Sequence, residues 1–182
     1  MKKNIDAFDY TGHICKSMKK GILLTTKSHG KVNTMTIGWG KIGIEWNRPV
    51  FIAYVRESRY TKTMLEASGE FTVNVPYGAL DSSILGYCGK KSGADTDKIA
   101  DLGLTLVDSD IVSAPGILEL PLTLECKVIY KQKQDLTQLP QEIIDRFYPA
   151  VGEDGFRDPH IAYYGEIVNA YLIAQEDEAG LC

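Results

Sequence analysis

Apolar and polar residues alternate with a period of two along much of the chain, and this pattern predicts β-strands. Residues 122–131 show it most clearly. One face of this segment carries Leu122, Leu124, Cys126, Val128 and Tyr130, and polar residues lie mostly opposite. The alternation predicts a half-buried antiparallel strand in which Cys126 is a small core residue.

Further strands follow from the same pattern. Residues 21–27 and 32–40 predict a hairpin, because Gly30 in the connecting turn supplies the positive φ that a tight turn needs. Three more runs predict strands: 50–55, 70–76 and 163–173. The first and the last of these are apolar on both faces, so we expect them in the middle of the sheet.

Helical signals are fewer and shorter. The sequence predicts four short helices, at residues 58–69, 79–89, 94–103 and 139–152. Ser58 is the expected N-cap of the first helix, an aspartate begins the second, and Gly69 and Gly103 are expected C-caps. Because strands dominate and no βαβ rhythm repeats, the predicted fold is mainly β, a closed or nearly closed antiparallel barrel with short peripheral helices.

Composition narrows the class of protein. A length of 182 residues with 44% hydrophobic residues suits one domain, residues 1–182. With 20 basic and 24 acidic residues the net charge is −4, so the composition lacks the excess of positive charge expected for binding to nucleic acid or to an anionic membrane. The four cysteines have no CxxC spacing, no signal peptide is visible, and no apolar run reaches membrane-spanning length. We therefore expect a cytoplasmic protein.

One short stretch suggests an anion site. In YVRESRYTKTM, residues 54–64, a strand ends where a helix begins, so free backbone N–H groups and the positive end of the helix dipole point the same way. The donors expected around that point are Arg56, Ser58, Arg59 and Thr61. They suit a phosphate monoester. The alternative is that Ser58 only caps the helix and that the arginines are solvated or pair with Glu57 and Glu66.

A second stretch, NTMTIGWG at residues 33–40, suits a flat heteroaromatic ring. Small, hydroxyl and amide side chains on a strand can present donors and acceptors to the ring edge, while Trp39 covers a face or an edge. The alternative is an ordinary strand with Trp39 in the core. Other chemistry is not indicated, since the chain lacks a P-loop, a GxSxG elbow, a GxGxxG motif and the residue spacing of a metal site.

Four motifs together resemble a known family. NTMTIGWG, RPVFIAYVRESRYT, GEFTVNVP and CGKKSGADTDK occur in the order found in the flavin reductase-like family of FMN-binding split barrels, which includes flavoredoxins. The resemblance covers about residues 21–173. It implies a homodimer of antiparallel split β-barrels of the Greek-key type, with FMN held near the subunit interface.

The resemblance also implies site residues. Those expected to border the isoalloxazine ring are Asn33, Thr34, Met35, Thr36 and Trp39, and those expected to bind the 5′-phosphate are Arg56, Ser58, Arg59 and Thr61. In CGKKSGADTDK the match falls on Ser92, Gly93, Asp97 and Lys98. Lys98 would reach the flavin or its phosphate, and the alternative is a lysine on a helix surface.

The last strand leaves choices open. Either Tyr163 or Tyr164 is expected beside the flavin. His160 would touch flavin or substrate, or would be a solvent-exposed loop histidine.

Three functions are compatible with this resemblance. The first is a flavin reductase in which NADH or NADPH reduces FMN, and the reduced flavin serves a partner oxygenase or another acceptor. The second is a flavoredoxin-like electron carrier with tightly bound FMN. The third is a non-catalytic barrel that binds a cofactor phosphate or haem. Without a Rossmann motif, any nicotinamide must bind transiently over the flavin.

Overall fold

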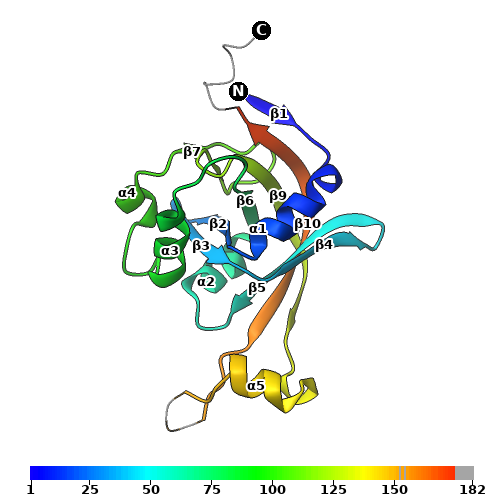
Figure 1. Cartoon of the computed structure of the whole chain (residues 1–182), viewed down its shortest axis with the longest axis vertical. Coiled ribbons are helices and arrows are strands. Elements are labelled where there is room, and N and C mark those ends of the chain that lie inside the picture. The colour runs from blue at the N-terminus through cyan, green and yellow to red at the C-terminus, as the bar shows by residue number, and fades with distance from the viewer. Residues whose placement is uncertain (152, 154, 175–182) are drawn as a thin grey trace.

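A computed structural model describes residues 1–151, 153 and 155–174, and its main element is an eight-stranded antiparallel sheet. The strand order is β3-β2-β6-β9-β10-β5-β4, and β1 pairs with the end of β10 (Figure 1). The bounds are β1 Lys2–Asn4, β2 Ile22–Ser28, β3 Lys31–Ile37, β4 Gly40–Glu45, β5 Arg48–Arg56, β6 Glu70–Val75, β9 Leu122–Lys133 and β10 His160–Ile173. A separate pair is formed by β7 Leu106–Val107 and β8 Gly116–Ile117.

The predicted antiparallel, mainly β fold is confirmed, and β5 and β10 lie inside the sheet as expected. The sheet is not closed, because the ladder ends at β3 on one side and β4 on the other. Closure of the barrel is therefore not confirmed.

The larger apolar core packs on one face of the curved sheet and under α1 (Thr11–Met18). Phe51, Phe71 and Tyr163 are among its largest fully buried side chains. Strand β10 approaches Phe71 so closely that a Cβ added at Gly165 would lie 2.4 Å from the phenyl ring. Glycine at this position lets the long strand bend over the core.

A second, smaller cluster packs on the other face of the sheet, under α3 (Ser82–Lys90), α4 (Lys98–Leu102) and the segment around β8. This layer corrects the prediction that β9 is only half buried, because Thr123 and Glu125 on its polar face are fully buried. The Glu125 carboxylate accepts hydrogen bonds of 2.7–2.9 Å from the backbone N–H groups of residues 110–112. A buried carboxylate with this many donors is satisfied without an ion pair.

Helix ends follow the predicted glycines but not the predicted serine. Helix α2 (Tyr60–Ser68) ends at Gly69 with φ 65°, and α4 ends at Gly103 with φ 60°. The prediction that Ser58 caps α2 is wrong: Arg59 is the capping position and provides no side-chain cap. The Ser58 hydroxyl instead donates to Asp158 Oδ2 over 2.7 Å.

Some elements carried no clear pattern in the sequence. These are β1, the 3₁₀ turns Ala7–Tyr10 and Leu136–Gln138, α1 and β4, whereas the predicted last helix is present as α5 (Gln141–Phe147). The strand predicted over 32–40 ends at Ile37, and β4 starts at Gly40, so Gly38 and Trp39 form the connection between them. Strand β4 then pairs with β5.

Figure 1 shows α3 and α4 beside the sheet and α5 at the far end of the long strands β9 and β10. In the part of the chain described, no helix has the length and apolar character to cross a membrane. A cytoplasmic location stays a prediction.

Candidate functional site

Three adjoining pockets form a trough that starts at the edge strand β3. The Lys98 pocket, of about 110 Å³, lies between the start of α2 and residues 88–98. The central pocket, of about 220 Å³, shares Met35 and Arg59 with it. The Gln134 pocket, of about 450 Å³, shares Gly38, Trp39 and Tyr54 with the central pocket. The two outer pockets have no lining residue in common, so they are opposite ends of the trough.

Lys98 is a buried cation at one end of this trough. Its side chain is only 4% exposed, and its ammonium group donates to two backbone carbonyls, Lys91 O over 3.2 Å and Cys88 O over 3.4 Å. Burial lowers the pKa of Lys98, and the nearby Arg59 guanidinium lowers it further. Lys98 is therefore not a helix-surface lysine, and no carboxylate among the described residues pairs with it.

Arg59 supplies a second positive charge to the same pocket. Its side chain is exposed and lines both the Lys98 pocket and the central pocket. The alternative of pairing with Glu57 or Glu66 does not hold, because these carboxylates pair with Lys133 and Lys131. Two cations without a carboxylate partner among the described residues line one small pocket, which makes it a candidate anion site.

Asn33, Thr61 and Gly93 meet beside these cations. The Asn33 Nδ2 atom donates to Thr61 Oγ1 over 2.9 Å, whereas Asn33 Oδ1 is buried and has no hydrogen-bond partner in the described structure. Gly93 packs against this amide, since a Cβ added there would lie 1.9 Å from Asn33 Oδ1. An orphaned buried acceptor is costly, and a ligand hydroxyl or N–H could satisfy it.

Arg56 and Ser58 hold a neighbouring segment of the chain. The Arg56 guanidinium donates to Asp158 O and to Phe147 O, each over 2.8 Å. Ser58 binds the Asp158 carboxylate through both its backbone N–H and its hydroxyl. Arg56 still lines the central pocket and Ser58 the Lys98 pocket, but Arg56 Nη1 and Nη2 and the Ser58 hydroxyl already have protein partners.

The remaining predicted residues within 54–64 and 88–98 either line the pocket or support it. Ser92 lines the Lys98 pocket, and its hydroxyl accepts from the Ala94 N–H over 3.2 Å. Asp97 has a structural part, because its carboxylate caps α4 by accepting hydrogen bonds from the backbone N–H groups of Ile99 and Ala100. Asp97 thereby fixes the helix that carries Lys98.

Strand β3 supplies the floor of the central pocket. Met35 and Thr36 line it, and the Thr36 hydroxyl donates to Leu85 O over 2.6 Å. Thr34 does not line the trough: it is fully buried, and its hydroxyl accepts a 3.0 Å hydrogen bond from Thr25 Oγ1 on β2.

Trp39 lies on the surface of the central and Gln134 pockets. It is 41% exposed, so the alternative of a core tryptophan is wrong. Its ring packs edge-on against Phe147, with centroids 5.2 Å apart, and at a tilt against His160 at 4.9 Å. This leaves an aromatic surface available to a ligand.

His160 is buried as the first residue of β10, so the alternative of a solvent-exposed loop histidine is wrong. Its Nδ1 atom is 2.9 Å from the Tyr148 hydroxyl. Burial, together with the nearby Arg56 guanidinium, lowers the pKa of His160 to about 4. The imidazole is therefore neutral at pH 7.

Tyr163 and Tyr164 do not line the trough within this chain. Tyr163 is in the apolar core, and its hydroxyl donates to Glu66 Oε1 over 2.8 Å. Tyr164 joins an aromatic cluster with Trp46 and Tyr130, at centroid distances of 6.0 and 5.0 Å.

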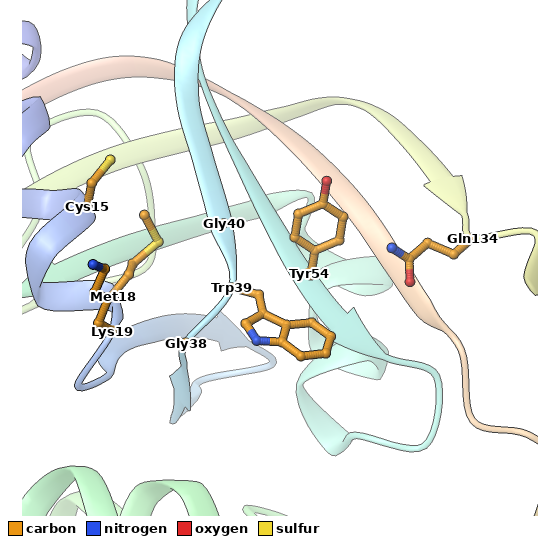
Figure 2. Close-up of a pocket in the computed structure, with 8 residues that line it drawn as sticks. All are labelled: Cys15, Met18, Lys19, Gly38, Trp39, Gly40, Tyr54 and Gln134. Atoms are coloured by element: carbon orange, nitrogen blue, oxygen red, sulfur yellow. The ribbon is translucent and has the colours of Figure 1, made fainter. Parts of the chain in front are cut away.

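The two outer walls of the Gln134 pocket, at α1 and at Gln134, were not predicted from the sequence. Figure 2 shows Cys15, Met18 and Lys19 at the end of α1 on one side of Gly40, and Tyr54 and Gln134 on the other. Of these, Gly40 and Tyr54 lay inside stretches with a motif, whereas Cys15, Met18, Lys19 and Gln134 did not. Residues from α1 and from the end of β9 come together only through folding.

Comparisons with known proteins place the chain in a family. A family model described as a flavin reductase-like domain matches residues 16–182. An uncharacterised protein of Archaeoglobus fulgidus is 33% identical over 129 residues, which cover 70% of this chain and 72% of that protein. A solved flavoredoxin from Methanosarcina acetivorans is 28% identical with a TM-score of 0.62, over 85% of this chain and 69% of that one. A split-barrel domain protein from Shewanella frigidimarina shares the fold at 18% identity, with a TM-score of 0.64 over 95% of this chain and 79% of its own.

Proposed function

The chain belongs to the flavin reductase-like domain family, and on this basis we propose that it binds FMN and that NADH or NADPH reduces the bound flavin. One observation carries the proposal: the trough has two unpaired cations, Arg59 and Lys98, at one end and the aromatic residues Trp39 and Tyr54 toward the other. FMN has the matching form, with a phosphate at one end and a flat ring at the other.

The Lys98 pocket fits the 5′-phosphate. Lys98 and Arg59 offer charged donors, each contributing about 1.5–3 kcal/mol as a charged hydrogen bond. The N-terminal turn of α2 adds a favourable dipole at Tyr60 and Thr61. Arg56 and Ser58 then have a supporting part, since they hold the segment before β10 against the site.

The middle of the trough fits the rest of the molecule. Met35, Thr36 and Trp39 would then lie along the ring. Bound FMN would supply the redox chemistry by accepting a hydride equivalent, and the protein would position the ring and control access to it.

A flavoredoxin-like electron carrier is the second candidate, favoured by the 28% identity to a solved flavoredoxin. The two functions differ in what must reach the ring. A reductase needs one ring face open to a nicotinamide at about 3–3.5 Å, whereas a carrier does not. In the reductase, reduced flavin would pass its electrons to a partner oxygenase or another acceptor.

Anaerobic stopped-flow mixing separates the two. The FMN-loaded protein is mixed with NADH and, separately, with NADPH, and flavin absorbance is followed. Bleaching at a rate that saturates with nicotinamide concentration supports the reductase. No bleaching by either nucleotide, together with rapid reduction by dithionite, would leave the carrier.

We also propose that residues 1–182 form one domain that assembles as a homodimer. The β4–β5 hairpin exposes Ile44 and Trp46, which are 72% and 56% exposed, and β4 is an edge strand that a second copy can cover. Sedimentation velocity tests this: Trp46→Ser should weaken the dimer, and Ile111→Ser, at a residue 49% exposed elsewhere, should not.

A further inference from the structure

The Gln134 pocket offers hydrogen-bond donors beyond what FMN requires, next to an aromatic wall that it shares with the central pocket. Trp39 and Tyr54 form its aromatic wall, and Lys19 and Gln134 lie on opposite sides of them (Figure 2). With a volume of about 450 Å³, the pocket has room for a single aromatic ring with small substituents.

The polar groups of this pocket are mainly donors. Gln134 Oε1 accepts from the Tyr148 hydroxyl over 2.7 Å, which leaves the amide nitrogen available, and Figure 2 shows that nitrogen on the side of Tyr54. Lys19 is exposed at the end of α1 and forms no ion pair with any described residue. A ligand of the pocket therefore needs acceptor groups at both ends of its ring.

FMN does not account for this donor set. FMN carries one phosphate, and the Lys98 pocket, which suits that phosphate, shares no lining residue with the Gln134 pocket. Among the described residues, the central and Gln134 pockets are lined by Lys19, Arg56 and Arg59 and by no carboxylate, although the chain has a net charge of −4. The positive end at Lys19 points to a second anion.

We propose that the Gln134 pocket binds a small aromatic carboxylate with a second polar group opposite the carboxylate, such as a para-substituted benzoate. The ring packs against Trp39 and Tyr54, Lys19 binds the carboxylate, and the Gln134 amide donates to the second group. Lys41 adds positive potential, because its ammonium lies 5.9 Å from the centre of the Tyr54 ring. This inference rests on the proposed function only for the presence of flavin in the adjoining pocket.

Calorimetric titration of the FMN-loaded full chain tests the inference with two matched probes, 4-hydroxybenzoate and its neutral isostere 4-hydroxybenzamide. The benzoate should bind about tenfold more tightly than the amide, as expected when a charged hydrogen bond is added. Lys19→Gln should abolish this preference and leave amide binding unchanged. Lys16→Gln, an exposed lysine of the same helix that does not line the pocket, is the control and should keep the preference.

The inference is overturned by equal affinities for the two probes, by an unchanged preference in Lys19→Gln, or by competition between benzoate and FMN. Competition would assign the Gln134 pocket to the flavin ring itself. The same titrations on flavin-free protein separate this test from the proposed function. Benzoate binding without any FMN binding would sink the FMN proposal and leave the aromatic carboxylate site standing.

Discussion

The Asn33 side-chain amide donates a 2.9 Å hydrogen bond to the Thr61 hydroxyl, which ties the edge strand β3 to the first turn of α2. This contact joins the two stretches that the sequence had suggested for a ring and for a phosphate. Both side chains are nearly fully buried, at 3% and 2% exposure. Because the contact is enclosed by Gly93, the shape of the Lys98 pocket depends on a residue without a side chain.

Gly93→Ala should damage both the fold and flavin binding. The added methyl would lie 1.9 Å from Asn33 Oδ1 and 3.2 Å from the Tyr60 ring, so Asn33 must move and lose its bond to Thr61. We expect a loss of about 1–3 kcal/mol in the free energy of unfolding. FMN affinity should fall at least as much, and urea unfolding with a fluorescence titration of FMN measures both.

Gly86→Ala is the matched control, because a Cβ at Gly86 meets nothing within 4 Å and the residue lies within α3. Alanine in a helix should stabilise the protein by about 0.5–1 kcal/mol. If Gly93→Ala behaves like this control, the close packing around Asn33 has been misjudged.

Arg59→Ala and Arg56→Ala should give opposite results. The Arg59 side chain has no hydrogen-bond or ion-pair partner among the described residues, so its loss should change stability by less than about 0.5 kcal/mol and weaken FMN binding by about 1.5–3 kcal/mol. Arg56 bonds two backbone carbonyls and lies 5.2 Å from the Tyr148 ring, so its loss should lower the melting temperature. Thermal melts with and without FMN distinguish the two, and a stability loss in Arg59→Ala with normal FMN affinity would make Arg59 structural.

The strands were predictable because apolar and polar residues alternate in a strand that has one face buried and the other exposed to water. The pattern failed where a strand has a second cover. Thr123 and Glu125 look solvent-facing in sequence, yet a segment some fifteen residues earlier buries them through backbone N–H bonds to Glu125. A polar residue in the sequence does not show whether its side chain is hydrogen-bonded to water or to backbone N–H groups that folding brings next to it.

The candidate site was predictable only where its residues are close in sequence. Arg59 and Thr61 were found because a strand end and a helix start lie side by side in the chain. Lys98 needed the family resemblance, since its burial depends on α3 and α4 packing against β3. Lys19 and Gln134 are 115 positions apart in the chain, and no motif near either residue indicated a binding site.

The neutral state of His160 should make stability depend on pH. Its pKa in the folded chain is about 4, below the ordinary value of 6.5, so the unfolded chain binds a proton between these values and the folded chain does not. Stability should therefore be complete above pH 6.5 and fall by about 2 kcal/mol as the pH drops to 4.5. Carboxylates with lowered pKa values, such as Glu66, contribute only below this window.

Urea unfolding at pH 6.5, 5.5 and 4.5 measures this dependence, with His160→Gln as the comparison. The variant cannot take up the proton, so its stability should change little across the window. An equally steep loss in the variant would show that another group is responsible.

Lys98→Met should separate stability from function. The lowered pKa of Lys98 means that its charged form is disfavoured in the folded protein, and methionine fills similar space without a charge. The flavin-free variant should therefore be as stable as the unaltered protein at pH 7, or more stable, while its FMN affinity falls by about tenfold or more. Riboflavin, which lacks the phosphate, should bind both proteins with similar affinity.

Parallel titrations with FMN and riboflavin measure the two affinities of Lys98→Met, and urea unfolding without either flavin measures its stability. If Lys98→Met weakens FMN and riboflavin equally, Lys98 contacts the ring or ribityl chain and the phosphate must bind elsewhere. If it unfolds the protein without affecting either affinity, Lys98 is there to hold α3 and α4 together through its two carbonyl contacts.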